Sequence, residues 1–447
     1  MTGDRTHAPF GDDYPETRSA GDLQAERDRV DQEVGRLLAL QSAPARHADR
    51  PTIVRGERIA SVTVERVRRG RDRPEVMLAR GSGLLRRAAA RRRGRYEQLE
   101  MVLVDDGVPG FPLVRLERSA TCRSTDDTPQ LLSKLGDEGS PAPNHVVPLG
   151  GIVMKAYGGA TPSAGGRGFP AVEPPNTPGA RVAVIDTGVS MEQRTDGYLQ
   201  NLLRPDNLDA LDVLPFPYAD GELDAAAGHG SAVTGIIQQV APGAQVRVYK
   251  VTDPFGVGTD WQIAQEIWRA ASDGATIINV SMGTPSIDGE PTPAMAAALE
   301  MLPDGVLVVC AAGNSGDTEK VWPAAFAETM PDRVVAVGSL DPDGAGSAWS
   351  SRGAWVTCSA IGRGVPSTYV IGKEDLEQTG GQPADTFGAN SWATCIGTSF
   401  AAPQVAGGVA RICQEQGLAP REALDKLLAG APRDAEFGAK VAILPGT

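Results

Sequence analysis

Short apolar runs alternate with amphipathic stretches in the second part of the chain. The runs are mostly apolar and lie at residues 181–186, 245–251, 275–282, 305–313 and 333–339. A strand covered by helices on both faces has this pattern, whereas a half-exposed strand alternates. Between the runs, residues 260–272, residues 293–301 and the stretch after His229 have helical spacing. The pattern predicts an α/β domain with a doubly wound, mostly parallel central sheet and helices on both faces, whose functional residues gather at the carboxyl ends of the strands.

The first part of the chain has a different pattern. Residues 21–42 carry apolar side chains at helical spacing among alternating charges, which predicts an amphipathic helix. Residues 59–67 alternate like a strand, and residues 84–99 have helical spacing. Residues 101–116 favour a hairpin that turns near Asp106-Gly107. We therefore expect a small α+β N-terminal domain ahead of the α/β domain.

A stretch rich in proline, glycine and small residues separates the two parts. It is ATPSAGGRGFPAVEPPNTPG at residues 160–179, a composition typical of an extended or flexible linker. The sequence thus predicts a disordered N-terminus at 1–20, a regulatory or propeptide-like domain at 21–159, this linker, and the α/β domain at 180–447.

Composition excludes several classes of protein. The contents of hydrophobic residues, 41%, and of charged residues, 22%, are those of a soluble globular protein. No apolar run approaches the roughly 18 residues needed to span a bilayer. The first 20 residues lack the basic start and apolar centre of a secretory signal, which predicts a cytoplasmic protein. The cysteines are odd in number, have no CxxC spacing and favour reduced thiols over disulfides or zinc; they are Cys122, Cys310, Cys358, Cys395 and Cys413.

Charge is distributed unevenly along the chain. Residues 1–175 hold 27 Lys and Arg against 24 Asp and Glu, whereas the remaining residues hold 16 against 32. Six arginines gather between Arg86 and Arg95, and such a cluster can meet nucleic acid, anionic lipid or an acidic protein face. The Leu and Ala residues around them favour a domain helix with a solvated arginine face, and Tyr96 is the one interleaved aromatic residue. We therefore do not expect nucleic acid as a partner.

Two of the predicted element ends carry an acid and a base. Asp186 directly follows an apolar run, so its carboxylate can be held partly buried at the sheet edge and accept a hydrogen bond from an imidazole. Alone, it is equally an ordinary turn aspartate. His229 lies between Gly228 and Gly230, and glycines let the backbone and a substrate approach closely. The other three histidines lie in polar segments or before the linker, so His229 is the natural general base, although a single histidine is more often structural.

A hydroxyl and an amide complete the set. Ser399 begins a helix after Gly397-Thr398, where unpaired backbone N–H groups and the positive end of the helix dipole favour an oxyanion. Asn314 lies at the tip of another apolar run, where its amide can donate to the same oxyanion as the Ser399 backbone N–H. Taken singly, Ser399 is also a good helix N-cap and Asn314 a turn residue. Together the four residues supply the nucleophile, base, orienting acid and oxyanion donors that acyl transfer requires.

These four segments resemble the motifs of the subtilisin-like serine proteases, or subtilases. VAVIDTG is similar to the family's aspartate motif, GHGSAVTG to its histidine motif, VCAAGNSG to its oxyanion-asparagine motif and GTSFAAPQVAG to its serine motif. They occur in the family's order at intervals of 43, 85 and 85 residues, and the resemblance extends from Arg181 to the C-terminus. It implies a subtilisin-like serine endopeptidase of the S8 type. Asp186, His229 and Ser399 would form its catalytic triad, and Asn314 and Ser399 its oxyanion hole.

The resemblance also implies where a substrate binds. INVSMGTP is similar to the family's substrate-binding strand, which pairs with the peptide backbone and borders the P1 pocket. The residues so implied are Ser281, Met282 and Gly283 on one wall of the pocket and Ala311, Ala312 and Gly313 on the other. Pairing of this kind requires a protein or peptide substrate in an extended conformation.

Several positions depart from the family's pattern or are ambiguous. Ala232 and Gln404 stand where the family usually has histidines, and neither position belongs to the triad. Cys310 and Cys395 are interpreted as small buried hydrophobic residues rather than oxidation-sensitive thiols. We assign no cofactor and no metal ligand. Subtilases often bind calcium, but DPDGAGS at 341–347 is only a loose match to a calcium loop and favours a turn.

Two functional hypotheses follow. The leading one is an active endopeptidase that forms an acyl-enzyme at Ser399. The alternative is a signalling or scaffold protein whose protease domain stays latent until a protein regulator binds its N-terminal region, which has no evident propeptide motif. An inactive pseudoprotease is disfavoured because every required residue is present.

Overall fold

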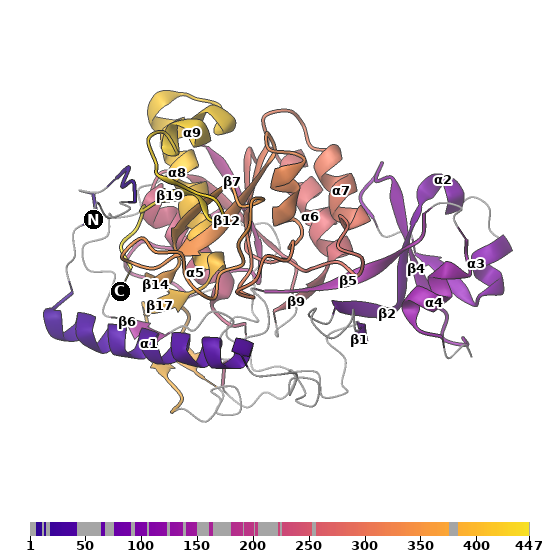
Figure 1. Ribbon diagram of the computed structural model, residues 1–447, viewed down its shortest axis with the longest axis horizontal. Coiled ribbons are helices and arrows are strands. Elements are labelled where there is room, and N and C mark those ends of the chain that lie inside the picture. The colour runs from indigo at the N-terminus through magenta and orange to yellow at the C-terminus, as the bar shows by residue number, and fades with distance from the viewer. Residues whose placement is uncertain are drawn as a thin grey trace.

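The computed structural model joins a large α/β domain to a smaller β-rich domain at one end of the molecule (Figure 1). The structure describes residues 6–10, 13–14, 18–42, 64–67, 76–90, 94–104, 107–122, 126–136, 140–149, 161–163, 180–190, 192–200, 202–203, 222–223, 226–252, 256–374 and 383–446. All ten residues predicted at the functional site lie within these ranges.

An eight-stranded sheet forms the centre of the α/β domain. Its strand order is β18-β19-β13-β12-β11-β10-β7-β8, and every neighbouring pair is parallel except β18 and β19. The strands are β7 (Arg181–Asp186), β8 (Gln245–Lys250), β10 (Ile277–Val280), β11 (Leu307–Ala311), β12 (Val334–Leu340), β13 (Cys358–Ile361), β18 (Arg433–Asp434) and β19 (Gly438–Val441). The predicted doubly wound, mostly parallel sheet is confirmed. Because β7, β10 and β11 are parallel neighbours, their carboxyl ends meet at one edge.

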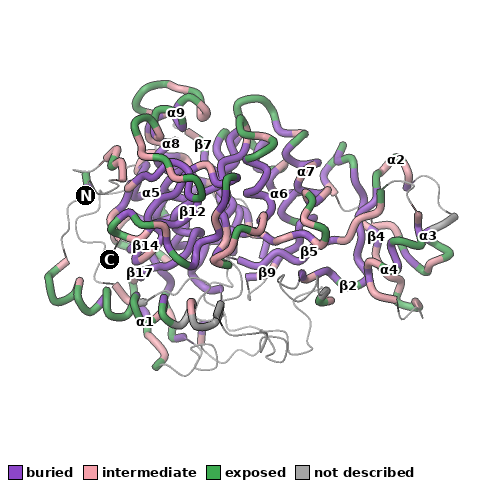
Figure 2. The backbone as a smooth tube through the Cα atoms, in the orientation of Figure 1, coloured by how far each residue is buried: buried purple, intermediate pink, exposed green. Residues whose placement is uncertain are grey.

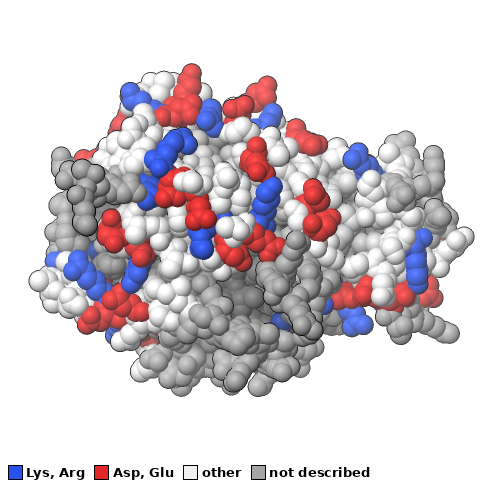
Figure 3. Space-filling view, in the orientation of Figure 1, with Lys and Arg blue, Asp and Glu red and all other residues white. Residues whose placement is uncertain are grey.

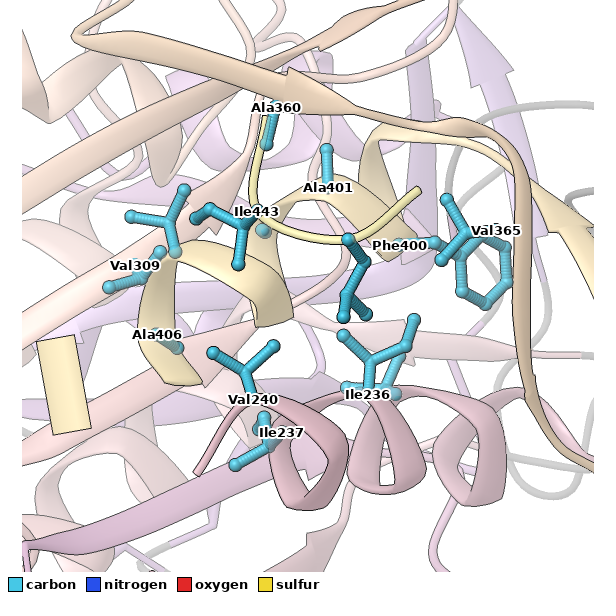
Figure 4. Packing of buried hydrophobic residues seen from close by; sticks show 14 of the residues in the cluster. Ile236, Ile237, Val240, Val309, Ala360, Val365, Phe400, Ala401, Ala406 and Ile443 are labelled. Carbon is cyan, nitrogen blue, oxygen red and sulfur yellow. The ribbon is translucent and has the colours of Figure 1, made fainter. Parts of the chain in front are cut away.

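Helices cover both faces of this sheet. One face carries α5 (His229–Val240), α8 (Thr398–Gln416) and α9 (Pro420–Leu427); the other carries α6 (Asp260–Ser272), α7 (Pro293–Glu300) and the 3₁₀-helix η3 (Ala324–Glu328). Side chains alternate along β7, so Val184 enters the first core and Ile185 the second. In the first core, Val240 of α5 lies near Ala406 of α8 (Figure 4). The two cores form the continuous buried centre of Figure 2.

The smaller domain is an antiparallel sheet with short helices. It contains β1 (Val64–Val67), β2 (Val76–Arg86), α2 (Arg87–Ala90), α3 (Gly94–Gln98), β3 (Met101–Val104), β4 (Leu113–Arg118), α4 (Thr128–Ser133) and β5 (Ala142–Pro148). The strand order is β3-β4-β2-β5, with β1 paired to β2. Strands and helical segments therefore follow one another as β-α-β-β-α-β from β2 to β5. Antiparallel pairing of β3 with β4 confirms the predicted hairpin, and residues 105–106 of its predicted turn lie outside the described residues.

The helix predicted over residues 84–99 is wrong at its start. Residues 84–86 are the end of β2 and pair with β4, and helix begins only at Arg87. Leu84 enters the core shared with the α/β domain, whereas Leu85 enters the core of the smaller domain. Burial on both sides of a strand thus overrides the helical spacing. Residues 91–93 of the arginine cluster and residues 59–63 of the predicted strand lie outside the described residues.

The smaller domain is attached to α6 and to a strand beside it. β5 pairs antiparallel with β9 (Val257–Thr259). Phe111 packs edge-to-face on Trp261 of α6, with 5.4 Å between ring centroids. The backbone N–H of Val108 donates to Oε1 of Gln265, also on α6, at 2.5 Å. Strand pairing and buried apolar contact therefore hold the two domains together.

The first helix lies at a different place. α1 (Ala20–Ser42) confirms the predicted amphipathic helix, and it packs on a three-stranded sheet of the α/β domain, away from the smaller domain (Figure 1). That sheet consists of β14 (Arg363–Thr368), β17 (Trp392–Ile396) and β6 (Thr161–Ser163), and a further pair is β15 (Gly372–Lys373) with β16 (Thr386–Phe387). The predicted domain boundaries stay a prediction. Of the predicted linker, only residues 161–163 are described, and they form β6.

Charged side chains do not gather into one patch on the face of the molecule shown in Figure 3. Acidic and basic side chains are interspersed over the face drawn in Figure 3. Within the described ranges, we find no helix with the length and apolar character of a membrane span.

Candidate active site

Asp186 and His229 are held together at the edge where β7 ends. Asp186 is fully buried, and its Oδ1 lies 2.7 Å from Nδ1 of His229. The same oxygen accepts the backbone N–H of Thr187 at 2.8 Å, which fixes the orientation of the carboxylate. A proton on Nδ1 is needed for donation to a carboxylate, so Nε2 of a neutral ring is left as the basic nitrogen.

Glycines on both sides of His229 allow this approach. Gly228 has φ +82°, and a Cβ there would lie 2.3 Å from the ring of Tyr369. A Cβ on Gly230 would lie 2.0 Å from the carbonyl oxygen of Gly188. The first turn of α5 is therefore pressed against the segment that follows β7, and a side chain at either glycine would displace the imidazole.

Ser399 lies at the start of α8 and is not hydrogen-bonded to His229. Its Oγ donates to the carbonyl oxygen of Ser281 at 3.0 Å, and Ser281 Oγ donates to the carbonyl oxygen of Ser399 at 3.0 Å. Nε2 of His229 is buried without a hydrogen-bond partner among the described residues. The ring centroids of Phe400 and His229 are 5.2 Å apart, so the first turn of α8 adjoins the imidazole while the hydroxyl faces Ser281.

Thr398 fixes the side chain of Asn314. Oδ1 of Asn314 accepts both the backbone N–H and the hydroxyl of Thr398, each at 2.9 Å. The amide nitrogen faces the start of α8, because a Cβ on Gly397 would lie 3.5 Å from Nδ2 of Asn314. The carbonyl end of the amide is thereby engaged, and its N–H₂ end is directed toward the neighbourhood of Ser399.

The two predicted pocket walls face a common side chain. A Cβ on Gly283 would lie 2.5 Å from Cγ1 of Val321, and one on Gly313 would lie 3.2 Å from Cγ2 of the same valine. Val321 therefore stands between the walls. The other predicted wall residues, Ser281, Met282, Ala311 and Ala312, are buried.

The chain's own residues lie along the predicted substrate-binding strand. Leu149 forms an antiparallel bridge with Met282, and its backbone N–H donates to the carbonyl oxygen of Gly256 at 2.9 Å. Leu149 continues β5, in which Val147 lies opposite Gly258 of β9. The smaller domain thus ends in an extended segment held between the residues that follow β10 and those that precede β9, as in β-strand addition. This segment lies where the family resemblance predicts an extended substrate.

A buried histidine–aspartate pair joins the two domains beside this segment. Nδ1 of His145 lies 3.4 Å from Oδ2 of Asp260, and the backbone N–H of His145 donates to Asp260 Oδ1 at 3.1 Å. Nε2 of His145 accepts the backbone N–H of Ile287 at 3.3 Å, so a neutral ring carries its proton on Nδ1, facing the carboxylate. Burial raises the pKa of Asp260, and the interactions with His145 oppose that rise.

The sequence motifs assign no role to two residues of this region, Thr398 and Leu149. A role for Thr398 could be inferred from its place directly before the serine of the fourth motif. Leu149 follows an apolar run, VVP, but no motif marks that run as a segment that would reach another domain. Its position depends on long-range strand pairing, which a local pattern does not encode.

Gln404, which departs from the family's pattern, and the cysteines near the site are packed in the interior. Buried Gln404 donates through Nε2 to the carbonyl oxygens of Ile361 and Phe400, at 2.6 and 2.8 Å, and accepts the backbone N–H of Leu444 at 3.1 Å. Burial raises the pKa of the Cys310 and Cys395 thiols, which keeps them protonated and suits the interpretation as small buried hydrophobic residues. All five cysteines are free thiols.

The loop at 341–347 does not fit a calcium site. Asp341 accepts a hydrogen bond from Ser347 at 2.6 Å through Oδ1, and its Oδ2 lies 3.1 Å from the guanidinium of Arg363. Both carboxylate oxygens are therefore engaged within a turn. In the part of the chain that the structure describes, no group of three or more His, Cys, Asp or Glu side chains is arranged to hold a metal ion.

The chain is similar to known proteins over its second part. A family model described as "Subtilase family" matches residues 177–439. Subtilisin BL and Subtilisin Savinase, both of Lederbergia lenta, are each 32% identical over 246 residues, which cover 53% of this chain and 77% of the relative. The alkaline protease of Shouchella clausii is also 32% identical over 246 residues, covering 54% of that protein.

One solved structure extends the likeness toward the N-terminus. Fervidolysin from Fervidobacterium pennivorans, described as a keratinolytic enzyme related to subtilisin, is 21% identical with a TM-score of 0.55. The match covers 87% of this chain and 64% of fervidolysin. Since 87% exceeds what residues 177–439 can supply, the shared fold includes part of the N-terminal region.

Proposed function

Because the chain belongs to the subtilase family and is a subtilisin-like serine endopeptidase, we propose that Asp186, His229 and Ser399 are its catalytic triad. The observation that carries this proposal is the buried contact of 2.7 Å between Asp186 Oδ1 and His229 Nδ1, with the start of α8 against the imidazole. The carboxylate holds the ring in the tautomer whose Nε2 is basic, and it stabilises the imidazolium that forms when Nε2 takes a proton.

Acylation begins when the hydroxyl of Ser399 turns from the Ser281 carbonyl to Nε2 of His229. Oγ then attacks the carbonyl carbon of the substrate while its proton passes to Nε2. The tetrahedral intermediate collapses as the imidazolium returns that proton to the leaving amine. The products are a free amine and an ester at Ser399. Water, deprotonated by the same nitrogen, hydrolyses the ester and restores the hydroxyl.

Asn314 and the first turn of α8 supply the oxyanion donors in this scheme. The side-chain amide of Asn314 and the backbone N–H of Ser399 point to the negative charge that develops on the substrate oxygen. Donors fixed before the reaction need no reorganisation as the charge appears, which is the largest single contribution in many such enzymes. Support comes from the two hydrogen bonds by which Thr398 fixes Asn314.

A fluorophosphonate probe tests the triad because it labels only a serine activated by its base. We expect labelling of the unsubstituted protein and its loss in Ser399→Ala and in His229→Ala. Ser272→Ala, which changes an exposed serine on α6, is the matched control and should label normally. Equal labelling of His229→Ala and the unsubstituted protein would show that His229 does not activate Ser399.

The substrate is proposed to bind as a strand between the segments at 281–283 and 256–258, with its P1 side chain between the walls completed by Ala311, Ala312 and Gly313. Protein segments or peptides that can extend are therefore the substrates, and a folded helix is not. The position of Leu149 between Met282 and Gly256 supports this mode, since these backbone groups already bind an extended segment.

The same contact favours a second, compatible proposal, that the full chain is latent. An extended substrate cannot pair with Met282 and Gly256 while Leu149 does. In this form the domain at 64–149 acts as an attached inhibitor, and a partner or a cut between Leu149 and Thr161 would be required for activity.

We also propose a cytoplasmic location for the protein and domain limits near residues 160 and 180. The five free thiols support the location.

Latency is tested by comparing the intact chain with one cut at introduced recognition sequences on both sides of the domain at 64–149, between Ser42 and Val64 and between Leu149 and Thr161. Hydrolysis of an internally quenched peptide should be slow in the intact chain and rise once the domain at 64–149 has left. Equal rates in the intact protein and in a preparation stripped of that domain would rule out latency and leave the triad proposal standing.

A further inference from the structure

The described residues between 7 and 38 lie on the α/β domain, ahead of the smaller domain in the chain. α1 lies beside β6, β14 and β17 in Figure 1, whereas the sheet of β2 to β5 lies at the other end of the molecule. The chain therefore contacts the peptidase domain, leaves it to form the smaller domain, and then returns. The two attachments of the N-terminal region use separate surfaces.

The first contacts of this segment are with β19 and α8. His7 forms a parallel bridge with Val441 of β19; its N–H donates to the Lys440 carbonyl at 3.1 Å, and its carbonyl accepts the Ala442 N–H at 2.7 Å. The guanidinium of Arg411, on α8, lies 4.3 Å from the ring centroid of Phe10. Residues from the start of the chain thus contact the end of β19 by backbone hydrogen bonds and α8 by a cation–π interaction.

A buried carboxylate fixes α1 to two strands. Glu26 is 4% exposed, and its Oε2 accepts hydrogen bonds from Arg18 at 2.7 Å and from Thr394 of β17 at 2.9 Å. Its Oε1 accepts the hydroxyl of Ser163 of β6 at 3.0 Å. Because a buried charge is costly unless it is paired and hydrogen-bonded, this glutamate specifies one position of α1 on the sheet.

Apolar side chains extend the contact along one face of the helix. Val30 is fully buried and Val34 nearly so, and both join a cluster with Trp349 and Ile396 of the peptidase domain. Gln32, on the same turns, is exposed. The helix therefore covers an apolar surface that would face water without it.

We propose that residues 7–38 are a docking segment that stays bound to the peptidase domain after the chain is cut between Leu149 and Thr161, and so retains the domain at 64–149 as a tethered inhibitor. This inference rests on the proposed latency. A tether turns rebinding of the inhibitory domain into an intramolecular event, which can raise its apparent affinity about 10²–10⁴-fold without any new contact. One cut then leaves the protein latent, and activity requires a second break between α1 and β1.

Retention is tested without catalysis in the full chain carrying Ser399→Ala. Recognition sequences for one site-specific protease are introduced between Ser42 and Val64 and between Leu149 and Thr161, singly and together. After both cuts, we expect the fragment with residues 1–42 to co-elute with the peptidase fragment in size-exclusion chromatography. The matched variants are Val30→Asp, on the buried face, and Gln32→Asp, on the exposed face. The first should reduce co-elution at least about 10-fold and the second should not.

The active chain supplies the second readout. We expect a cut between Leu149 and Thr161 alone to leave peptide hydrolysis low, and both cuts together to raise it at least about 10-fold after the middle fragment dissociates. Separate elution of residues 1–42 from a folded peptidase fragment, in the chain with neither Asp variant, would overturn the proposal. So would a full rate after the single cut. Co-elution is measured with Ser399→Ala, whereas fluorophosphonate labelling is measured with the active protein. Either result can therefore fail while the other succeeds, which separates the retention proposal from the triad proposal.

Discussion

At the scale of single residues, the proposed oxyanion hole depends on a side chain that does not touch the substrate. Thr398 gives two hydrogen bonds to Oδ1 of Asn314, and its own Oγ1 accepts the backbone N–H of Gly313 at 3.1 Å. The hydroxyl therefore links the donor side chain to the strand end that carries it. Such a positioning residue should affect the transition state more than the bound substrate.

We predict that Thr398→Val lowers kcat about 10-fold with little change in KM. Removing an oxyanion donor costs about 10²–10³ in kcat, and loosening one without removing it should cost less. Steady-state kinetics on a peptide, after release of the smaller domain, would measure the split. Thr398→Ser keeps the hydroxyl and should retain most of the activity; a Thr398→Val enzyme as fast as the Ser variant would contradict the positioning role.

The position of Val321 leads to a prediction about which P1 side chains the enzyme prefers. Its two methyl groups face Gly283 and Gly313, so the proposed P1 pocket is short and should favour small side chains. Val321→Gly should raise kcat/KM for a peptide with Phe at P1, relative to one with Ala, by at least about 10-fold, since each methylene is worth about 1–3 kcal/mol. Val321→Ala should fall between the two. An unchanged Phe-to-Ala ratio in both variants would place Val321 outside the pocket.

Sequence motifs predict which residues meet, but not how each side chain is turned. Asp186 and His229 are brought together as the strand-end argument predicts, because parallel strands place their carboxyl ends at one edge. The hydroxyl of Ser399 faces Ser281 instead, a choice between rotamers that differ by little energy and leave no pattern in the sequence.

At the scale of elements, Gln404 joins α8 to two other segments. It bonds the carbonyl of Ile361 at the end of β13 and the backbone N–H of Leu444 after β19. Gln404→Leu would leave these buried groups without their partner, at about 1–3 kcal/mol each. We therefore predict a loss of at least about 2 kcal/mol in the free energy of unfolding, measured with denaturant in the Ser399→Ala background. The exposed Gln416→Leu, on the same helix, should change it by less than about 0.5 kcal/mol.

Asp260 gives the contact between β5 and α6 a dependence on pH. Its folded pKa is raised, chiefly by burial, so the folded protein holds this proton more tightly than the unfolded chain. Its contribution to stability is complete below the unfolded pKa, about 4, and is lost as pH rises through the folded pKa. The unfolding free energy of the wild type minus that of Asp260→Asn should therefore fall from pH 4 to neutrality. Denaturant curves in the Ser399→Ala background would measure it, with exposed Asp332→Asn as control; a difference that rises with pH would contradict the sign.

The strands and helices of the α/β domain were predictable because each depends on local burial. A parallel strand covered on both sides is a continuous apolar run, and α6 begins and ends at the residues that its helical spacing predicts. The prediction is wrong at residues 84–86 because the strands that pair with them, β4 and β5, come from distant parts of the sequence. α1 was predictable as a helix, but the surface it covers was not.

At the scale of the whole molecule, the smaller domain is held to the peptidase domain by apolar packing on α6. Phe111 is fully buried against Trp261, and Leu84, Val147 and Leu149 share one core with α6 and α7. The two parts of the chain differ in net charge, yet these contacts are mainly apolar and strand-to-strand. A count of charges does not locate an interface, because burial of specific side chains decides its energy.

Weakening this packing should therefore release the proposed latency without a cut. Phe111→Ala removes a buried aromatic ring, a change that costs about 3–5 kcal/mol in a core, and part of that loss falls on the contact with Trp261. Detachment of the smaller domain would free Met282 and Gly256 from Leu149, so peptide hydrolysis by the intact chain should rise at least about 10-fold. Val102→Ala is the matched control, since Val102 belongs to the same domain and is 46% exposed. If Phe111→Ala hydrolyses the peptide no faster than Val102→Ala while labelling normally at Ser399, the smaller domain is not what limits access to the site.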